Sequence, residues 1–159
     1  MNSYDSEKFF EEEYIRSMRK EYEKLLELIK RGHLLLESQA RDLAKIYNFD
    51  TEELEKALIS GEYNAYLSLI KEGEIGLKKY AEEIAKKYNL PDKEIDDAVR
   101  IGILRRYSQY LSSIKKGNLA WIEYARKFAE KYDLPLEDLE RAIKIGKIRN
   151  IKNGGFSLE

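Results

Sequence analysis

Apolar side chains recur at intervals of three and four residues along most of the chain, the spacing that places them on one face of an α-helix. One such stripe runs through Phe10, Tyr14, Met18, Tyr22, Leu26 and Ile29. A second stripe passes without a break through a glycine, at Ile95, Val99, Ile103, Tyr107, Leu111 and Ile114. Uninterrupted apolar runs are at most three or four residues long, far short of a membrane span. The pattern therefore predicts amphipathic helices throughout.

The pattern is repeated three times, over 21–61, 62–102 and 103–146. The first two copies agree at 16 of 41 positions, and the second and third agree at 17 of 40, which is too many for chance at a fixed offset. Ten positions are identical in all three copies; in the first copy they are Tyr22, Leu26, Ile29, Lys30, Gly32, Ala40, Ala44, Tyr47, Ala57 and Gly61. Most are small or apolar, which indicates that they pack between helices.

Each copy holds three helices, and the third is expected to run on into the first helix of the next copy. The predicted helices are about 6–31, 34–47, 51–72, 75–88, 92–116, 118–132 and 136–150. Gly32 and its equivalents are expected to be helix C-caps, whereas Gly61 and its equivalents are kinks or close-contact points. At the helix starts, Ser6 is predicted as an N-cap, Pro91 and Pro135 as first-turn prolines, and Asp50 with Glu53 as a capping box.

The expected fold is all-α: three tandem three-helix units of about 41 residues, about seven helices in all, packed as a short helical-repeat array or compact bundle. Residues 1–20 would be a helical extension continuous with the first repeat, standing in for the third helix of a missing unit. Residues 147–159 would be a basic C-terminal tail.

The second and third helices of each copy are spaced like a helix-turn-helix. The matching sets are Ala44-Asn48-Leu54-Ala57, Ala85-Asn89-Ile95-Ala98 and Ala129-Asp133-Leu139-Ala142. A DNA-reading helix presents its N-terminal residues to base edges between rows of phosphates. Here those positions are mostly acidic, as at Glu52, Asp96 and Glu137, and phosphates would repel them. The turn is therefore interpreted as structural.

Charge is unevenly distributed along the chain of 159 residues. Residues 1–102 carry 17 basic and 23 acidic side chains, whereas residues 103–159 carry 12 basic and 7 acidic ones. The candidate basic binding surface comprises Arg105, Arg106, Lys115, Lys116, Arg126, Lys127, Lys144, Lys147, Arg149 and Lys152. Such a surface can contact phosphates without reading bases, or dock an acidic protein such as the acidic half of a second copy. It can equally be a solvated face.

Catalytic and metal-binding signals are weak. The chain has no cysteine and one histidine, His33, which is interpreted as a surface or capping residue. No P-loop or dinucleotide glycine pattern occurs, and adjacent carboxylates such as Glu52 and Glu53 face different ways on a helix. No catalytic, metal or cofactor site is therefore predicted.

Twelve tyrosines raise the alternative of stacking on nucleic-acid bases. Repetition at equivalent positions favours core packing for Tyr22, Tyr47 and their equivalents, with the hydroxyls at the rim, and Trp121 is expected in the core as well. Four tyrosines recur in two copies only and are less easily assigned; these are Tyr66, Tyr80, Tyr110 and Tyr124.

The leading functional hypothesis is a non-enzymatic interaction module that binds a protein partner or itself. The alternative is a nucleic-acid-associated protein that uses the basic C-terminal surface. A weaker third is an enzyme with carboxylates in a cleft between units. The high Lys, Glu and Ile content with two glutamines is typical of thermophiles. With no secretion signal at the N-terminus and no cysteine, a cytoplasmic location is expected, without a membrane or metal partner.

Overall fold

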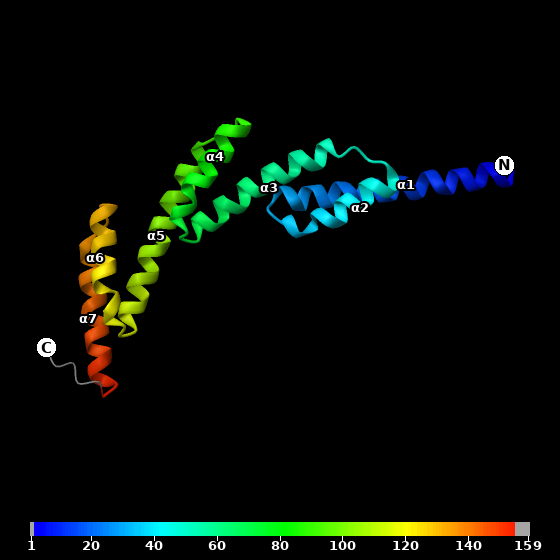
Figure 1. The fold of residues 1–159 in the computed structure, drawn as a ribbon. Coiled ribbons are helices and arrows are strands. Elements are labelled where there is room, and N and C mark those ends of the chain that lie inside the picture. The colour runs from blue at the N-terminus through cyan, green and yellow to red at the C-terminus, as the bar shows by residue number, and fades with distance from the viewer. Residues whose placement is uncertain (1, 155–159) are drawn as a thin grey trace. The chain divides into compact units, whose positions relative to one another are not determined.

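The computed structural model describes residues 2–154 and contains no β-strand in that range. The helices are α1 (Ser3–Lys30), α2 (Glu37–Tyr47), α3 (Glu52–Lys71), α4 (Lys78–Tyr88), α5 (Lys93–Lys115), α6 (Ile122–Lys131) and α7 (Leu136–Lys152). Short 3-10 helices lead into α2, α4 and α6; these are η1 (Leu34–Leu36), η2 (Ile75–Leu77) and η3 (Leu119–Trp121). The structure confirms the all-α class and the alternation of long and short helices (Figure 1).

Gly32, Gly73 and Gly117 end the helices that precede them, as predicted. Their φ angles are +107°, +117° and +100°, a region that residues with a Cβ rarely adopt. At the first of these turns the Gly32 N–H donates to the Ile29 carbonyl at 2.9 Å. The glycine conformation thus turns the chain back and satisfies a carbonyl that the helix leaves free.

Gly61, Gly102 and Gly146 lie inside α3, α5 and α7, so the long helices do run through them. All three are buried. A Cβ on any of them would overlap a backbone carbonyl oxygen of the preceding long helix, which belongs to Ile29, Ile70 and Ile114, respectively. These glycines are therefore close-contact points between helix backbones, one of the two roles expected for them.

The turns between the second and third helices use left-handed residues. Asn48, Asn89 and Asp133 have φ angles of 55°, 53° and 52°, a conformation that Asn and Asp tolerate well. The helices that follow carry exposed acidic residues in their first turns, including Glu52 in α3 and Asp96 in α5. These carboxylates suit the positive end of their own helix dipole, which supports the structural interpretation of the turn.

The details of the helix starts differ from the predictions. The N-cap of α1 is Asn2, whose side chain accepts from the Asp5 N–H at 2.9 Å, so the prediction of Ser6 was wrong. Ser6 lies within the first turns, because α1 continues toward the N-terminus as far as Ser3. Pro135 occupies the N-cap position of α7 rather than its first turn, and Pro91 precedes α5 by two residues.

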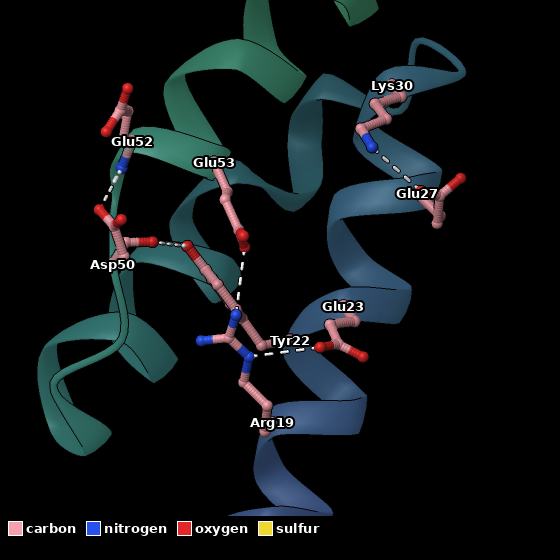
Figure 2. Close-up of polar contacts among 8 residues, drawn as sticks. All are labelled: Arg19, Tyr22, Glu23, Glu27, Lys30, Asp50, Glu52 and Glu53. Carbon is pink, nitrogen blue, oxygen red and sulfur yellow. Dashed lines mark hydrogen bonds and ion pairs between the residues drawn. The ribbon is translucent and has the colours of Figure 1, made fainter.

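The predicted capping box at the start of α3 is half formed (Figure 2). The Asp50 side chain accepts from the Glu52 N–H at 2.9 Å. The Glu53 carboxylate instead binds the Arg19 guanidinium at 3.3 Å. Arg19 also lies over the Phe49 ring, 5.4 Å from its centroid. The Glu53 side chain, which would complete the capping box, therefore links α3 to α1 instead.

Three buried tyrosines tie the long helices to these turns. The hydroxyls of Tyr22, Tyr63 and Tyr107 donate to backbone carbonyls 28 residues further along, which belong to Asp50, Pro91 and Pro135. Figure 2 shows the first of these bonds, 3.0 Å long. Each ring is at most 4% exposed. The predicted arrangement, with the ring in the core and the hydroxyl at the rim, is confirmed for this set.

Loss of one such hydroxyl is expected to weaken the fold measurably. Tyr107→Phe leaves the Pro135 carbonyl without its partner, and the free energy of unfolding should fall by about 1 kcal/mol. Burial, and then the nearby Asp138 charge, raise the pKa of Tyr107 above its ordinary value. The unfolded chain therefore loses this proton first as the pH rises, so wild-type stability is full below about pH 10 and falls above it.

Urea unfolding at neutral and alkaline pH checks this prediction. Tyr107→Phe should show the smaller loss of stability on going to alkaline pH, since it has no phenol to ionise at that site. Tyr124→Phe is the matched control, because Tyr124 is 65% exposed. Equal stability of Tyr107→Phe and the wild type at neutral pH would contradict the assignment.

The chain divides into two compact units. The first holds the residues through Ser68 together with Lys79–Asp92; the second holds Leu69–Lys78 and the residues from Lys93 onward. The core of the first unit is built from α1, α2 and α3, by Tyr22, Leu25, Leu26, Ile29, Ala40, Ala44, Leu54 and Ala57. The core of the second is built from α5, α6 and α7, by Tyr107, Ile114, Ala125, Ala129, Leu139 and Ala142. The repeat boundaries, as domain boundaries, stay a prediction.

Candidate interaction surfaces

The first half of α1 extends past α2 and the start of α3 (Figure 1). Residues 7–17 are all exposed, and the buried residues of α1 begin at Tyr22. Large apolar side chains stand in this exposed segment; they are Tyr4, Phe9, Phe10, Tyr14 and Ile15, with exposed fractions of 71%, 51%, 69%, 57% and 39%. The Tyr14 ring meets Tyr47 of α2 with centroids 6.1 Å apart. About four turns of helix, roughly 22 Å, thus extend beyond the core of this unit.

This segment does not reproduce the third helix of a preceding repeat, contrary to the expectation. Where the repeats place Leu54, Ala57 and Gly61, α1 has Glu13, Arg16 and Lys20. Glu13 and Arg16 pair with each other at 2.8 Å. A lysine cannot allow the backbone contact that the glycine allows, and charged side chains cannot replace the leucine in a core. The segment continues the helix but lacks the residues that bury one.

Acidic and aromatic residues share one side of this segment. Tyr4, Glu7, Phe10, Glu11 and Tyr14 follow one another at intervals of one or three residues, which places them on one broad face. We call this the acidic–aromatic face. Residues 3–17 carry five acidic side chains against two basic ones. The sequence signal for this surface was present, because Glu7 and Glu11 lie beside Phe10 and Tyr14 of the apolar stripe on the same side of the helix.

The outer side of α7 has the opposite character. Arg141, Lys144, Ile145, Ile148 and Lys152 share the side of the helix that faces away from the buried Leu139 and its core neighbours. Ile145 is 41% exposed and Ile148 is 53% exposed. Among the residues that the structure describes, no carboxylate lies within 4 Å of these three cations. We call this the basic–isoleucine face.

The ten predicted basic residues are all in the second unit but do not form one cluster. Lys115 and Lys116, at the end of α5, lie near the end of α7, because the Asn150 side chain donates to the Gly117 carbonyl at 3.1 Å. The α7 residues at that end are Lys147, Arg149 and Lys152. Of the predicted tail over 147–159, residues 147–152 belong to α7. Residues 155–159 lie outside the described part of the chain.

The remaining members are placed elsewhere in the unit. Arg105 and Arg106 lie near the opposite end of α7, since the neighbouring Tyr107 bonds Pro135. Arg126 and Lys127 lie on α6, and Lys144 lies on the outer side of α7. In the described structure none of the ten has a carboxylate within 4 Å. The structure thus brings about half of them together at one end of the unit.

A groove of about 380 Å³ follows α5 beside the start of α7. It is lined by Leu104, Tyr107, Ser108, Leu111, Ser112, Lys115 and Asp138. Its charged groups are the Lys115 amine at the end of α5 and the Asp138 carboxylate near the start of α7. The groove offers a small mixed surface without a convergent set of acids.

Trp121 is not a core residue, contrary to the expectation. Its side chain is 36% exposed, and it stacks on Tyr110 with centroids 5.5 Å apart. Tyr124 follows, 5.6 Å from the indole and 65% exposed. In the second copy Tyr66 stacks on Tyr80 at 6.0 Å. The tyrosines that recur in two copies thus form ring stacks that reach the surface.

Three further tyrosines also lie nearer the surface than expected. Tyr88 is 41% exposed, and Tyr47 and Tyr132 are half-buried. Tyr47 and Tyr88 are the last residues of α2 and α4, and Tyr132 directly follows α6. His33 is exposed before η1 and makes no side-chain capping bond, which agrees with a surface residue.

Within residues 2–154 no group of three or more His, Asp or Glu side chains is placed to hold a metal ion. The same residues include no helix that combines the length and the apolar character needed to cross a membrane. No protein-family model, curated protein or solved structure matches the chain. The surfaces themselves therefore carry the functional argument.

Proposed function

We propose that the chain is a non-enzymatic interaction module that binds another protein chain. A second copy of the same chain is a suitable partner, because the charges of its two helix faces are opposite. The observation that carries this proposal is the exposed first half of α1, with large apolar side chains and no core of its own. Exposed apolar side chains gathered on one helix are typical of a surface that another chain covers.

The basic–isoleucine face of α7 complements the acidic–aromatic face of α1. Each face alternates apolar and charged side chains over three to four turns, and the charges are opposite. A helix packed against a helix can bury Phe10 and Tyr14 against Ile145 and Ile148 while carboxylates meet amines at the rim. Two different faces meet, so the contact is heterologous and can add further copies. Its length is that of a small interface, and weak, salt-sensitive association is expected.

Sedimentation velocity over a concentration series tests the proposal. The average mass should rise above the 18.7 kDa of one chain as the concentration increases from about 10 to about 500 µM, and less so at high salt. Glu7→Lys with Glu11→Lys should abolish association, as should Arg141→Glu with Lys144→Glu. Mixing the two variants should restore association, because each then meets a face of opposite charge.

The control is Glu123→Lys with Glu130→Lys, which reverses two exposed charges on α6 outside both faces. This variant should associate as the wild type does. A mass of one chain at every concentration and salt level, or no recovery in the mixture, would overturn the self-binding proposal.

The second candidate function is association with nucleic acid. It is favoured by the ten predicted cations of the second unit, which lack carboxylate partners within 4 Å in the described structure. Unpaired cations contribute affinity for phosphates at each contact, and that affinity falls as salt rises. The experiment described below includes duplex and single-stranded probes and tests this candidate directly.

A further inference from the structure

Tyr110, Trp121 and Tyr124 form a ring cluster on the second unit, which we call the aromatic platform. Tyr110 and Trp121 stack with an interplanar angle of 25°, and Tyr124 is tilted by 54° against the indole. Tyr110 is half-buried and braced by Phe128 at 5.4 Å, so the platform rests on the core. Its outer members are 36% and 65% exposed. Large ring faces are thus fixed at the surface.

Three cations lie beside this platform or on its side of α6. The Arg106 guanidinium lies 6.0 Å from the Tyr110 ring centroid. Lys127 and Lys131 follow Tyr124 by three and seven residues on α6, which places them on its side of the helix, and the Lys131 ammonium lies 5.3 Å from the centroid of the Tyr132 ring. The carboxylates of α6, Glu123 and Glu130, lie about 100° or more around the helix from Tyr124. The charged side chains that share the side of Tyr124 on α6 are therefore basic.

The three copies of the repeat act as internal controls for this arrangement. At the positions of Arg106, Trp121, Tyr124 and Lys127, the first copy has Glu21, Leu36, Gln39 and Asp42. The second copy has Glu62, Leu77, Tyr80 and Glu83. The same fold thus accepts leucine, glutamine and acids there. Packing alone does not require the aromatic and basic residues that the third copy combines.

We propose that the aromatic platform binds single-stranded polynucleotide, with bases stacked on Trp121 and Tyr124 and phosphates near Arg106, Lys127 and Lys131. Exposed rings beside a basic surface are the combination that holds single strands, because every base offers a π face. Bases in a duplex are already stacked on one another, so they cannot use the platform. This inference rests on the second candidate function and is independent of self-association.

The indole of Trp121 gives a direct readout, because it is the one tryptophan of the chain. Titration with oligo-dT or oligo-U should quench its fluorescence, and the quenching should weaken steeply as salt rises from about 50 to about 200 mM. Comparison of the two oligomers shows whether DNA or RNA is preferred. Duplex DNA and poly-glutamate supply charge without free base faces and should leave the fluorescence unchanged.

The variants are taken from the first copy, whose residues the fold accepts at these positions. Tyr124→Gln should weaken oligo-dT binding by about 5- to 100-fold in fluorescence anisotropy, since it removes one stacking surface. Lys127→Asp should weaken binding and reduce its salt dependence. Lys93→Glu, an exposed residue at the start of α5 that lies outside the ten predicted cations and outside both faces, is the matched control and should bind within about twofold of the wild type. Circular dichroism verifies that each variant is folded.

Three outcomes would contradict the proposal that the platform binds single-stranded polynucleotide. The first is no quenching by oligo-dT at the lower salt concentration. The second is equal quenching by poly-glutamate, which would assign the surface to acidic protein. The third is binding that Lys144→Glu removes but Tyr124→Gln leaves intact, which would place nucleic acid on α7 and retain the second candidate function without the platform.

Discussion

Gly146→Ala is expected to destabilise the chain by about 2–4 kcal/mol. Alanine is the better helix former by about 1 kcal/mol, so propensity alone predicts a gain in stability. In α7, however, the new Cβ would overlap the Ile114 carbonyl oxygen and come within 3.2 Å of the Leu119 side chain. A backbone carbonyl cannot rotate away as a side chain can. Either α7 separates from α5 or both backbones deform, and each response loses packing.

Urea unfolding followed by far-UV circular dichroism measures this effect. Gly76→Ala in η2 is the matched control, because a Cβ there has no neighbour within 4 Å and Gly76 has no positive φ. Its stability should lie within about 1 kcal/mol of the wild type. Gly61→Ala in the first unit should behave like Gly146→Ala, since its Cβ would overlap the Ile29 carbonyl. Stabilisation by Gly146→Ala would refute the close backbone contact.

Leu139→Ala should lower the free energy of unfolding by about 3 kcal/mol. Leu139 is 1% exposed and belongs to the core formed by α5, α6 and α7. Removal of three buried carbon atoms loses their transfer free energy and leaves a cavity that a core braced by close helix contacts closes poorly. The loss should appear as a lower midpoint with an unchanged dependence on urea concentration.

Leu136→Ala, one turn earlier in the same helix, is the control for this change. The chemistry is identical, but Leu136 is 46% exposed, and the expected cost is below about 1 kcal/mol. The Leu-to-Ala difference in helix propensity is only a few tenths of a kcal/mol, so the difference between the two variants chiefly reports burial. Equal effects of the two substitutions would mean that Leu139 does not lie in a packed core.

Much of the fold could be predicted from the sequence, because local chemistry controls the C-terminal ends of the helices. The C-cap glycine at Gly32 and the left-handed Asn48 act through their own φ angles. The repeat added evidence, since a feature that occurs in three copies is hard to mistake. Continuity of the long helices could be predicted for a related reason: the apolar stripe keeps its period through Gly102, which a helix end would have broken.

The candidate surfaces were less predictable. Trp121 aligns with Leu36 and Leu77, so equivalence placed it in the core, yet the large indole reaches the surface. Tyr88 was assigned inward by the same logic and is 41% exposed. Equivalent positions share a backbone environment, but the size of the side chain determines how far its outer edge extends into solvent. Alignment of the copies alone could not predict how much of a larger side chain is exposed.

The sequence by itself determined the helical class, the repeat, the glycine and Asn or Asp turns that follow the helices, and the opposite charges of the two halves, because each depends on residues near one another in the chain. Tertiary structure alone decided which stripes are covered. Tyr14 and Tyr22 belong to one stripe in sequence, but a neighbouring helix buries Tyr22 and leaves Tyr14 57% exposed. Burial depends on what packs opposite a residue, and that partner lies far away in sequence.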